Sequence, residues 1–260
     1  MKRGSDYAKR IKRLYHDLVK KHGRPGPHEA GDPIDQMVVG ILSLNTSIAK
    51  AQAVYKKLRQ QTVDLNELRV TPAIEMAEAI GDGVPLAASK AERVVGALNA
   101  VRRRQDTLDL NFLRQRGRRE AREYLESLGG VGPTVAAHVV LFSLGGHAIP
   151  VDDLTLYVLR KEGLIDNHAD AATAQGFLER LIASSEAADF VQLLSRHVSA
   201  YASRVPVEKL SDLLHPPAPK PSKPAAEPPA PAAAEPAPKA APKDKKPSKS
   251  PAKAPVHKKK

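Results

Sequence analysis

The amino-acid composition changes abruptly near His215, and this change limits which part of the chain can fold. Residues 216–260 hold 14 of the 22 prolines of the 260-residue sequence, contain no aromatic residue and consist otherwise mostly of alanine and lysine. Such a segment cannot bury enough apolar surface to offset the entropy that it loses on ordering. We therefore predict a disordered tail over 215–260, a folded body over 31–214, and an N-terminal basic helix with its connector over 1–30.

Positive charge is concentrated in the same C-terminal segment. Its eleven lysines outnumber three acidic residues, so the segment carries +8 of the formal net charge of +12. A lysine-rich tail attracts polyanions, and nucleic acid is the commonest polyanion that a basic protein meets. The composition fits a tail that binds DNA or protein, and it also fits a tail that only keeps the chain in solution.

The composition excludes several classes of site. The sequence has no cysteine, which excludes disulfides, zinc–thiolate sites and iron–sulfur clusters held by cysteine. No apolar run reaches the roughly 20 residues that cross a bilayer, and no apolar signal-peptide stretch follows the basic N-terminus. The histidines lack paired metal-ligand spacing, and no phosphate-binding glycine loop or nucleophile elbow occurs. We expect a cytoplasmic protein that holds no metal and no organic cofactor and makes no membrane contact.

Helical periodicity recurs along the body, whereas strand patterns are weak. One largely apolar stretch opens with Asp32, which is placed to cap a helix, and with Pro33 at the first helical position. Another, SKAERVVGALNAVRRR, opens with Ser89 as the expected N-cap and Glu92 as the second member of a capping box. Glycine and proline turns separate such stretches. The sequence therefore predicts an all-α body built from short helices.

The most specific stretch of the body is LGGVGPTVAAHVVLFSLGGHAIPVDD, which runs from Leu128 to Asp153. It combines a glycine-rich turn, an apolar helix that starts at Pro133, a second turn and two adjacent carboxylates. Glycines allow positive φ and close approach of another molecule, and the first amides of the next helix suit an anion such as a phosphate. The alternative is an ordinary turn between two helices, because glycine is also common at a helix C-terminus.

The order of these features resembles the helix-hairpin-helix DNA glycosylases of the endonuclease III type. The likeness rests on the L-x-G-V-G turn, the apolar helix and the V-D pair that ends at Asp152. DPIDQMVVGILSLNTS, SKAERV and LLSRHVSAYA extend it, because they resemble the family's early helix ending in L-S-x-Q-T, its S-K-A-E stretch and its late helix with a histidine, here His197. The resemblance covers approximately residues 30–204. It implies a two-lobed all-α fold that binds double-stranded DNA across the cleft between its lobes.

The resemblance also implies which residues bind DNA. In the hairpin, the backbone amides of Gly130, Val131 and Gly132 would hold phosphates. Thr134 and Asn45 would lie at the same DNA-binding surface. The hairpin carbonyls of relatives can in addition hold a monovalent cation, which would be the one ion to expect here.

Asp152 occupies the position of the family's catalytic carboxylate. A carboxylate at this place would stabilise the oxocarbenium-like sugar and position water, after the target base has been flipped out of the stack. Asp153 is the second candidate for this role. Either aspartate could instead serve only as the N-cap of the helix that follows, where Asp is favoured.

Departures from the family pattern limit the reactions that the resemblance implies for this chain. Bifunctional relatives have a lysine that forms a Schiff base with the sugar at the position of Thr134, so no lyase step can proceed by that route. Lys90 and Lys161 lie elsewhere in the pattern and receive no role. The four-cysteine cluster loop is absent, Asn45 replaces a glutamine, and Tyr157 stands where an arginine is common.

The resemblance thus implies a monofunctional DNA N-glycosylase without an iron–sulfur cluster. It would act as a monomer associated with the nucleoid. The alternative is a non-catalytic DNA-binding, damage-sensing or architectural protein that has kept the fold. The sequence does not name the base that would be removed.

Overall fold

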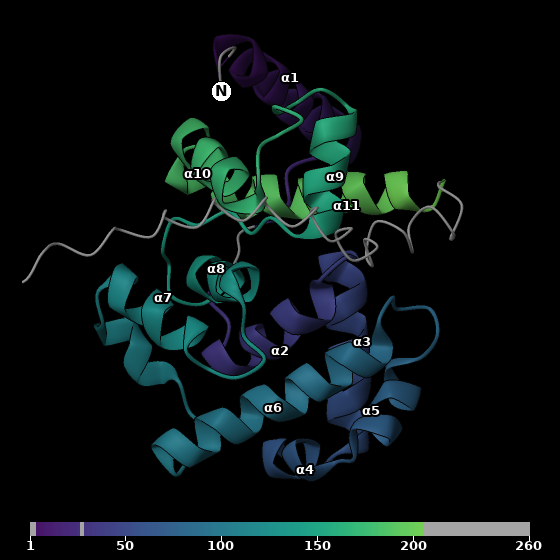
Figure 1. Cartoon of the computed structure of the whole chain (residues 1–260), viewed down its shortest axis with the longest axis vertical. Helices are drawn as coiled ribbons and strands as arrows, with labels where there is room; N and C mark the ends of the chain where they lie inside the picture. Colours follow the sequence, from purple (N-terminus) through teal and green to yellow (C-terminus); the bar gives the residue numbers. More distant parts are fainter. Residues whose placement is uncertain (1–3, 27–28, 205–260) are drawn as a thin grey trace, which may run out of the picture. The chain divides into compact units, whose positions relative to one another are not determined.

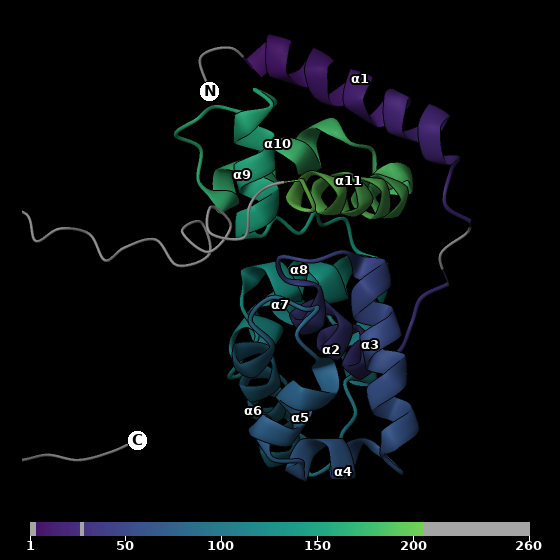
Figure 2. The same ribbon diagram turned by 90° about the vertical axis from the view of Figure 1, so that its right-hand side faces the viewer.

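The computed structural model describes residues 4–26 and 29–204 of the chain. The disordered tail expected over 215–260 lies outside these residues. Within them the chain is helical and has no strand, which confirms the all-α prediction. The helices build two hydrophobic cores, which lie on either side of one central helix (Figures 1 and 2).

Six α-helices and one short 3-10 helix surround the first core. They are α2 (Pro33–Ser43), α3 (Ile48–Gln61), α4 (Leu65–Val70), α5 (Ala73–Ile80), α6 (Ala87–Gln105), η1 (Asn111–Gln115) and α7 (Arg118–Glu126). The helices of the second core are α1 (Gly4–His22), α9 (Asp153–Lys161), α10 (Ala171–Leu181) and α11 (Ala187–Ala202), with the 3-10 turn η2 (Ser184–Glu186) before α11.

The central helix α8 (Pro133–Phe142) contributes to both cores. Val135 to Val140 lie in the first core, whereas Leu141 and Phe142 lie in the second. Its sequence is apolar on every face, and such a helix is stable in water only when it is surrounded by other elements. The apolar composition that the sequence shows after Pro133 therefore places this helix at the centre of the protein.

The N-terminal helix α1 is amphipathic and joins the second core. Ile11, Tyr15 and Leu18 are buried on one face, and the Tyr15 ring packs edge-on against Phe190 with centroids 5.5 Å apart. On the exposed side, Arg10 donates a hydrogen bond of 2.9 Å to the carbonyl of Gly163. The basic residues of this helix thus flank an apolar stripe that anchors it to α11.

The start of α2 was predicted correctly. Asp32 accepts from the amides of Ile34 and Asp35, and Pro33 is the first residue of α2. Ser89 as an N-cap was wrong, because α6 begins at Ala87 after a left-handed Leu86 with φ of 59°. Alanine is the best helix former, so the two alanines before Ser89 extend the helix towards the N-terminus.

No single helix of residues 4–26 and 29–204 is long and apolar enough to cross a bilayer; α2 and α3 pass that test only as a pair bent by 120°.

We predict that Gly40→Val destabilises the protein. A Cβ atom at Gly40 would lie 3.2 Å from Val135 Cγ1 and 3.3 Å from the His138 ring, so the glycine lets α2 approach α8 closely. The added methyl groups should lower the free energy of unfolding in urea by about 1–3 kcal/mol. Gly96→Ala is the matched control, because its Cβ would meet nothing closer than 3.9 Å. A tolerated valine at position 40 would contradict this account of the α2–α8 contact.

Candidate functional site

We call each core with its surrounding helices a lobe. Asp152 lies where the two lobes meet, immediately before α9. It is the N-cap of that helix, and its Oδ1 accepts a hydrogen bond of 2.8 Å from the amide of Thr155. Its other oxygen, Oδ2, accepts a bond of 2.6 Å from the amide of Asn45, in the turn between α2 and α3. The carboxylate is therefore oriented by one amide from each lobe.

The Asn45 side chain forms another hydrogen bond between the same two segments. Its Oδ1 accepts a hydrogen bond of 3.1 Å from the amide of Leu154, in the first turn of α9. Its backbone is in the left-handed region with φ of 57°, which asparagine adopts more easily than most residues. The Asn45 side chain, predicted to lie at the DNA-binding surface, is thus turned towards α9.

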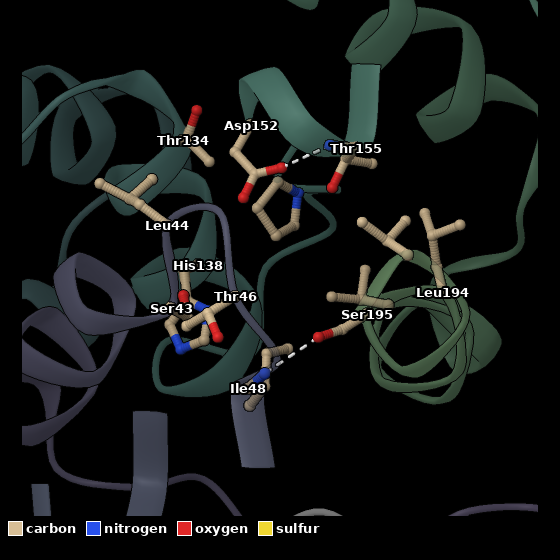
Figure 3. A pocket seen from close by; sticks show the side chains of 13 residues that line it. Ser43, Leu44, Thr46, Ile48, Thr134, His138, Asp152, Thr155, Leu194 and Ser195 are labelled. Carbon is tan, nitrogen blue, oxygen red and sulfur yellow. Dashed lines mark hydrogen bonds between the residues drawn. The ribbon is translucent and has the colours of Figure 1, made fainter. Parts of the chain in front are cut away.

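A second hydrogen bond joins the lobes close by. Ser195 Oγ on α11 accepts a bond of 2.9 Å from the amide of Ile48, the first residue of α3. The first amides of a helix have no partner within the helix, so this hydroxyl satisfies one of them. Figure 3 shows both this bond and the bond from Thr155 to Asp152 around the pocket between them.

The glycine turn before α8 forms a tight hairpin. Gly130 has φ of 88°, and a Cβ atom there would lie 2.5 Å from the carbonyl oxygen of Arg93, so only glycine fits. Gly132 caps α8, and Pro133 is the first residue of that helix. Val131 is buried in the first core, and its amide donates to the carbonyl of Leu128 over 3.1 Å.

The bonds of the hairpin decide which of its groups can face a ligand. Because the Val131 amide is used within the turn, the amides of Gly130 and Gly132 are the ones that a phosphate could contact. The Gly130 carbonyl accepts a bond of 2.9 Å from Arg93 Nε. This guanidinium puts a positive charge at the carbonyl, so the hairpin does not fit the monovalent cation that relatives hold.

Thr134 is the second residue of α8 and faces the loop before α9. Its hydroxyl donates a hydrogen bond of 3.0 Å to the carbonyl of Val151, next to Asp152. The structure therefore brings Thr134, Asn45 and Asp152 together. Asp153 is the first residue of α9 and is exposed.

Two cavities share Asp152 and Thr134. The smaller one, of about 40 Å³, lies between the lobes (Figure 3). Its lining combines apolar side chains, several of them from α11, with the polar groups of Ser43, His138 and Ser195. The larger cavity has a volume of about 270 Å³. Its polar lining consists of Asn45, Ser89, Lys90, Arg93, Thr134, Asp152 and Asp153.

His138 and His197 lie in different surroundings. His138 is buried on α8, and its Nε2 lies 3.1 Å from Gln36 Oε1. His197 on α11 pairs with Glu162, with 2.8 Å between Nε2 and the nearer carboxylate oxygen. His197 does not line either of the two cavities that contain Asp152.

Lys90, to which the sequence pattern assigns no role, lines the larger cavity. Only 2 % of this lysine is exposed, and within the described part of the chain its Nζ has no hydrogen-bond partner. Burial lowers its pKa from 10.5 to about 7; the Asp152 carboxylate opposes the shift, and the charges of Lys50 and Arg93 add to it. The sequence of α6 does indicate that Lys90 is buried, because helical spacing places it on the apolar face of Val94, Ala97 and Val101.

No family model matches the chain. A curated protein of Arabidopsis thaliana, named "Putative DNA glycosylase At3g47830", is 26 % identical over 164 residues, which are 63 % of this chain and 56 % of that protein. The chain thus spans little more than half the length of this relative.

Solved structures of DNA glycosylases share the fold. An endonuclease III–DNA covalent intermediate superposes with a TM-score of 0.55 at 20 % identity, over 72 % of this chain and 84 % of the other. A thermostable thymine-DNA glycosylase gives 0.54 at 21 % identity over 80 % and 94 %. The 3-methyladenine DNA glycosylase of H. pylori gives 0.52 at 17 % identity over 77 % and 99 %.

We predict that Lys90→Met stabilises the protein most at low pH. The unfolded chain binds a proton at this lysine up to about pH 10.5, whereas the folded chain releases it near pH 7. The free energy of unfolding of the wild type therefore increases as the pH rises between these two values, because the unfolded chain binds more protons at Lys90 than the folded chain does. The methionine variant should exceed wild type by about 2 kcal/mol or more at pH 6, and by much less at pH 10.

Urea unfolding at both pH values measures this difference. Lys56→Met, at an exposed lysine of α3, is the control and should change stability little at either pH. A gain that is the same at pH 6 and pH 10 would show that the buried amine is not the cause.

Proposed function

We propose that this chain, which has the endonuclease III-like fold of the helix-hairpin-helix DNA glycosylases and lacks their cluster cysteines, is a base-excision repair enzyme. Its reaction would be the hydrolysis of the N-glycosidic bond of a damaged or mismatched base in double-stranded DNA. The observation that carries the proposal is the position of Asp152, held at the junction of the lobes and open to both cavities.

The geometry of Asp152 suits a carboxylate that acts on a sugar. Two amides fix its orientation, and each uses one lone pair, so an ionised carboxylate still has acceptor sites for a third partner. As the glycosidic bond breaks, its electron pair leaves with the base and positive charge develops on the sugar. Asp152 would stabilise that charge and accept the proton of the water that adds to C1′.

The hairpin would hold the DNA while the base is out of the stack. The amides of Gly130 and Gly132 and the N-terminal end of α8 point out of one turn, which is a favourable place for a phosphate. Arg93 fixes the turn from α6 through the Gly130 carbonyl. Flipping is required because the glycosidic bond is not accessible in a stacked duplex.

Thr134 supports a monofunctional reaction. Its hydroxyl cannot form the Schiff base that a lysine forms at this position in bifunctional relatives. Water would therefore displace the base, and strand breakage would not be coupled to base removal. We further propose that the protein acts as a cytoplasmic, nucleoid-associated monomer.

A non-catalytic DNA-binding or damage-sensing protein is the second candidate. The observation that favours it is the capping geometry, because both oxygens of Asp152 accept amide hydrogen bonds as those of a purely structural N-cap would. In that case the hairpin would bind DNA and no base would be released.

Asp152→Asn should lower the rate of base removal by about 100-fold or more, because the substitution removes the charge next to the developing cation. Asparagine is also a good N-cap, so α9 should remain intact. The assay uses end-labelled duplexes with uracil, oxidised pyrimidines, 8-oxoguanine, alkylated purines, or A·G and T·G mismatches. Breaks are measured with and without alkali.

The neighbouring carboxylate provides the matched control. Asp153→Asn should keep most of the activity, since Asp153 makes no bond across the junction in the described structure. If Asp153→Asn abolishes base loss and Asp152→Asn does not, the catalytic assignment is wrong. If the wild type binds tightly and releases no base from any duplex, the non-catalytic candidate replaces the enzyme.

Gly132→Asp should weaken binding to every duplex by roughly tenfold, because it places a negative charge beside the phosphate. The backbone there has φ of −97° and the nearest atom to a new Cβ is 3.6 Å away, so a side chain fits. Gly132→Asn has the same shape without the charge and serves as the control. Fluorescence anisotropy on damaged and undamaged duplexes measures the loss, and equal affinity of the two variants would contradict a phosphate at this turn.

A further inference from the structure

We propose that Lys90 is the amine of an imine-forming site, which captures the open-chain aldehyde of an abasic deoxyribose in the cavity that it shares with Asp152 and Thr134. The inference rests on the proposed function in one respect, because it requires the chain to bind DNA through the hairpin. It adds a second reaction, on the sugar left after base removal.

Lys90 lines the same cavity as the groups that would hold the sugar. Its walls come from the start of α6, the hairpin and α8, the turn before α9, and the α2–α3 turn. Gly132 and Thr134 line it from the hairpin and the start of α8, and Asp152 lines it from the turn before α9, next to Val151, whose carbonyl Thr134 contacts. A sugar whose phosphate rests on the hairpin and whose C1′ faces Asp152 would therefore lie against Lys90.

The state of the amine suits a nucleophile. Lys90 is almost completely buried, and its Nζ has no hydrogen-bond partner within the described residues. A buried ammonium without a partner is costly, so desolvation favours the neutral amine. Burial lowers its pKa to about 7, so the neutral amine, which can attack a carbonyl, is populated near neutral pH.

The other lysines of this region are already engaged. Lys50 Nζ donates to the carbonyl of Gly83, and the residue is exposed. Lys161 lies on α9 with its Nζ 5.5 Å from the centre of the Tyr157 ring. Neither lines the larger cavity, so Lys90 is the lysine that the described structure places beside Asp152.

Capture proceeds by addition and loss of water. The lone pair of Nζ attacks the aldehyde carbon C1′, a C–N bond forms, and the carbonyl electron pair moves to oxygen, which takes up a proton from water. Asp152 accepts a proton from the attacking nitrogen and returns it to the departing hydroxyl. Water leaves, and a C=N bond remains. Addition of water reverses the steps and releases the sugar.

Borohydride trapping of the full-length protein tests the proposal. The probe is a duplex with an abasic site prepared beforehand by removal of uracil, so the test does not require this chain to release a base. Sodium borohydride reduces the C=N bond to a stable secondary amine. We expect a covalent protein–DNA adduct in the wild type, with peptide mass mapping of the link to Lys90.

Variants separate capture from binding. Lys90→Met and Lys90→Arg should lose at least 90 % of the adduct, whereas Lys50→Met should keep it. A duplex with a tetrahydrofuran in place of the abasic sugar has no aldehyde and should give no adduct. Wild type and Lys90→Met should bind that duplex within a few-fold of each other, and thermal melting confirms that both are folded.

Each remaining outcome of the trapping experiment supports or overturns the proposed imine site. No adduct despite tight binding to the tetrahydrofuran duplex overturns the proposal, as does an adduct that maps to another lysine, including those of 215–260. Parallel loss of adduct and of binding in Lys90→Met, without a link mapped to Lys90, makes the residue a DNA contact only. An adduct at Lys90 in a protein that releases no base supports the imine site and overturns the glycosylase.

Discussion

The reciprocal pairing of Asn45 with the first turn of α9 is the interaction on which the proposed site depends. The Asp152 carboxylate accepts from the Asn45 amide, and the Asn45 side chain accepts from the amide of Leu154. The two bonds join segments that are more than one hundred residues apart in the chain. Without them Asp152 would be held by α9 alone, and the bond between Ile48 and Ser195 would remain as the hydrogen bond described between the lobes at the smaller cavity.

Part of this arrangement could be predicted from the sequence, because local chemistry determines it. Asp32 and Pro33 start α2 as their residue types require, and an aspartate before α9 is a favoured N-cap. The hairpin needs glycine at position 130, where φ is positive and the backbone of Arg93 leaves no space for a side chain. The family resemblance and the all-α fold follow from these same residues.

The rest depends on contacts between distant parts of the chain, which no local pattern encodes. Asn45 could be compared with the glutamine of relatives, but its bond to Leu154 comes from the packing of two lobes. Lys90 receives no role from the sequence because it does not lie at the position of the family's lysine. The residues that share its face of α6 are apolar. Only the structure shows that the hairpin and the loop before α9 cover this face of α6. Ser89 failed as a cap because the left-handed turn at Leu86 starts the helix earlier.

The central position of α8 has a consequence for how the protein opens. One end of this helix fills the first core and the other end fills the second, so neither lobe has a complete interior without it. The lobes are therefore expected to unfold as one cooperative unit, with α8 as the slowest element to exchange its amide hydrogens. If the chain acts on DNA as proposed, the motions that admit a nucleotide would be confined to the segments that cross between the lobes, since a rigid-body separation would expose the apolar surface of the shared helix to water.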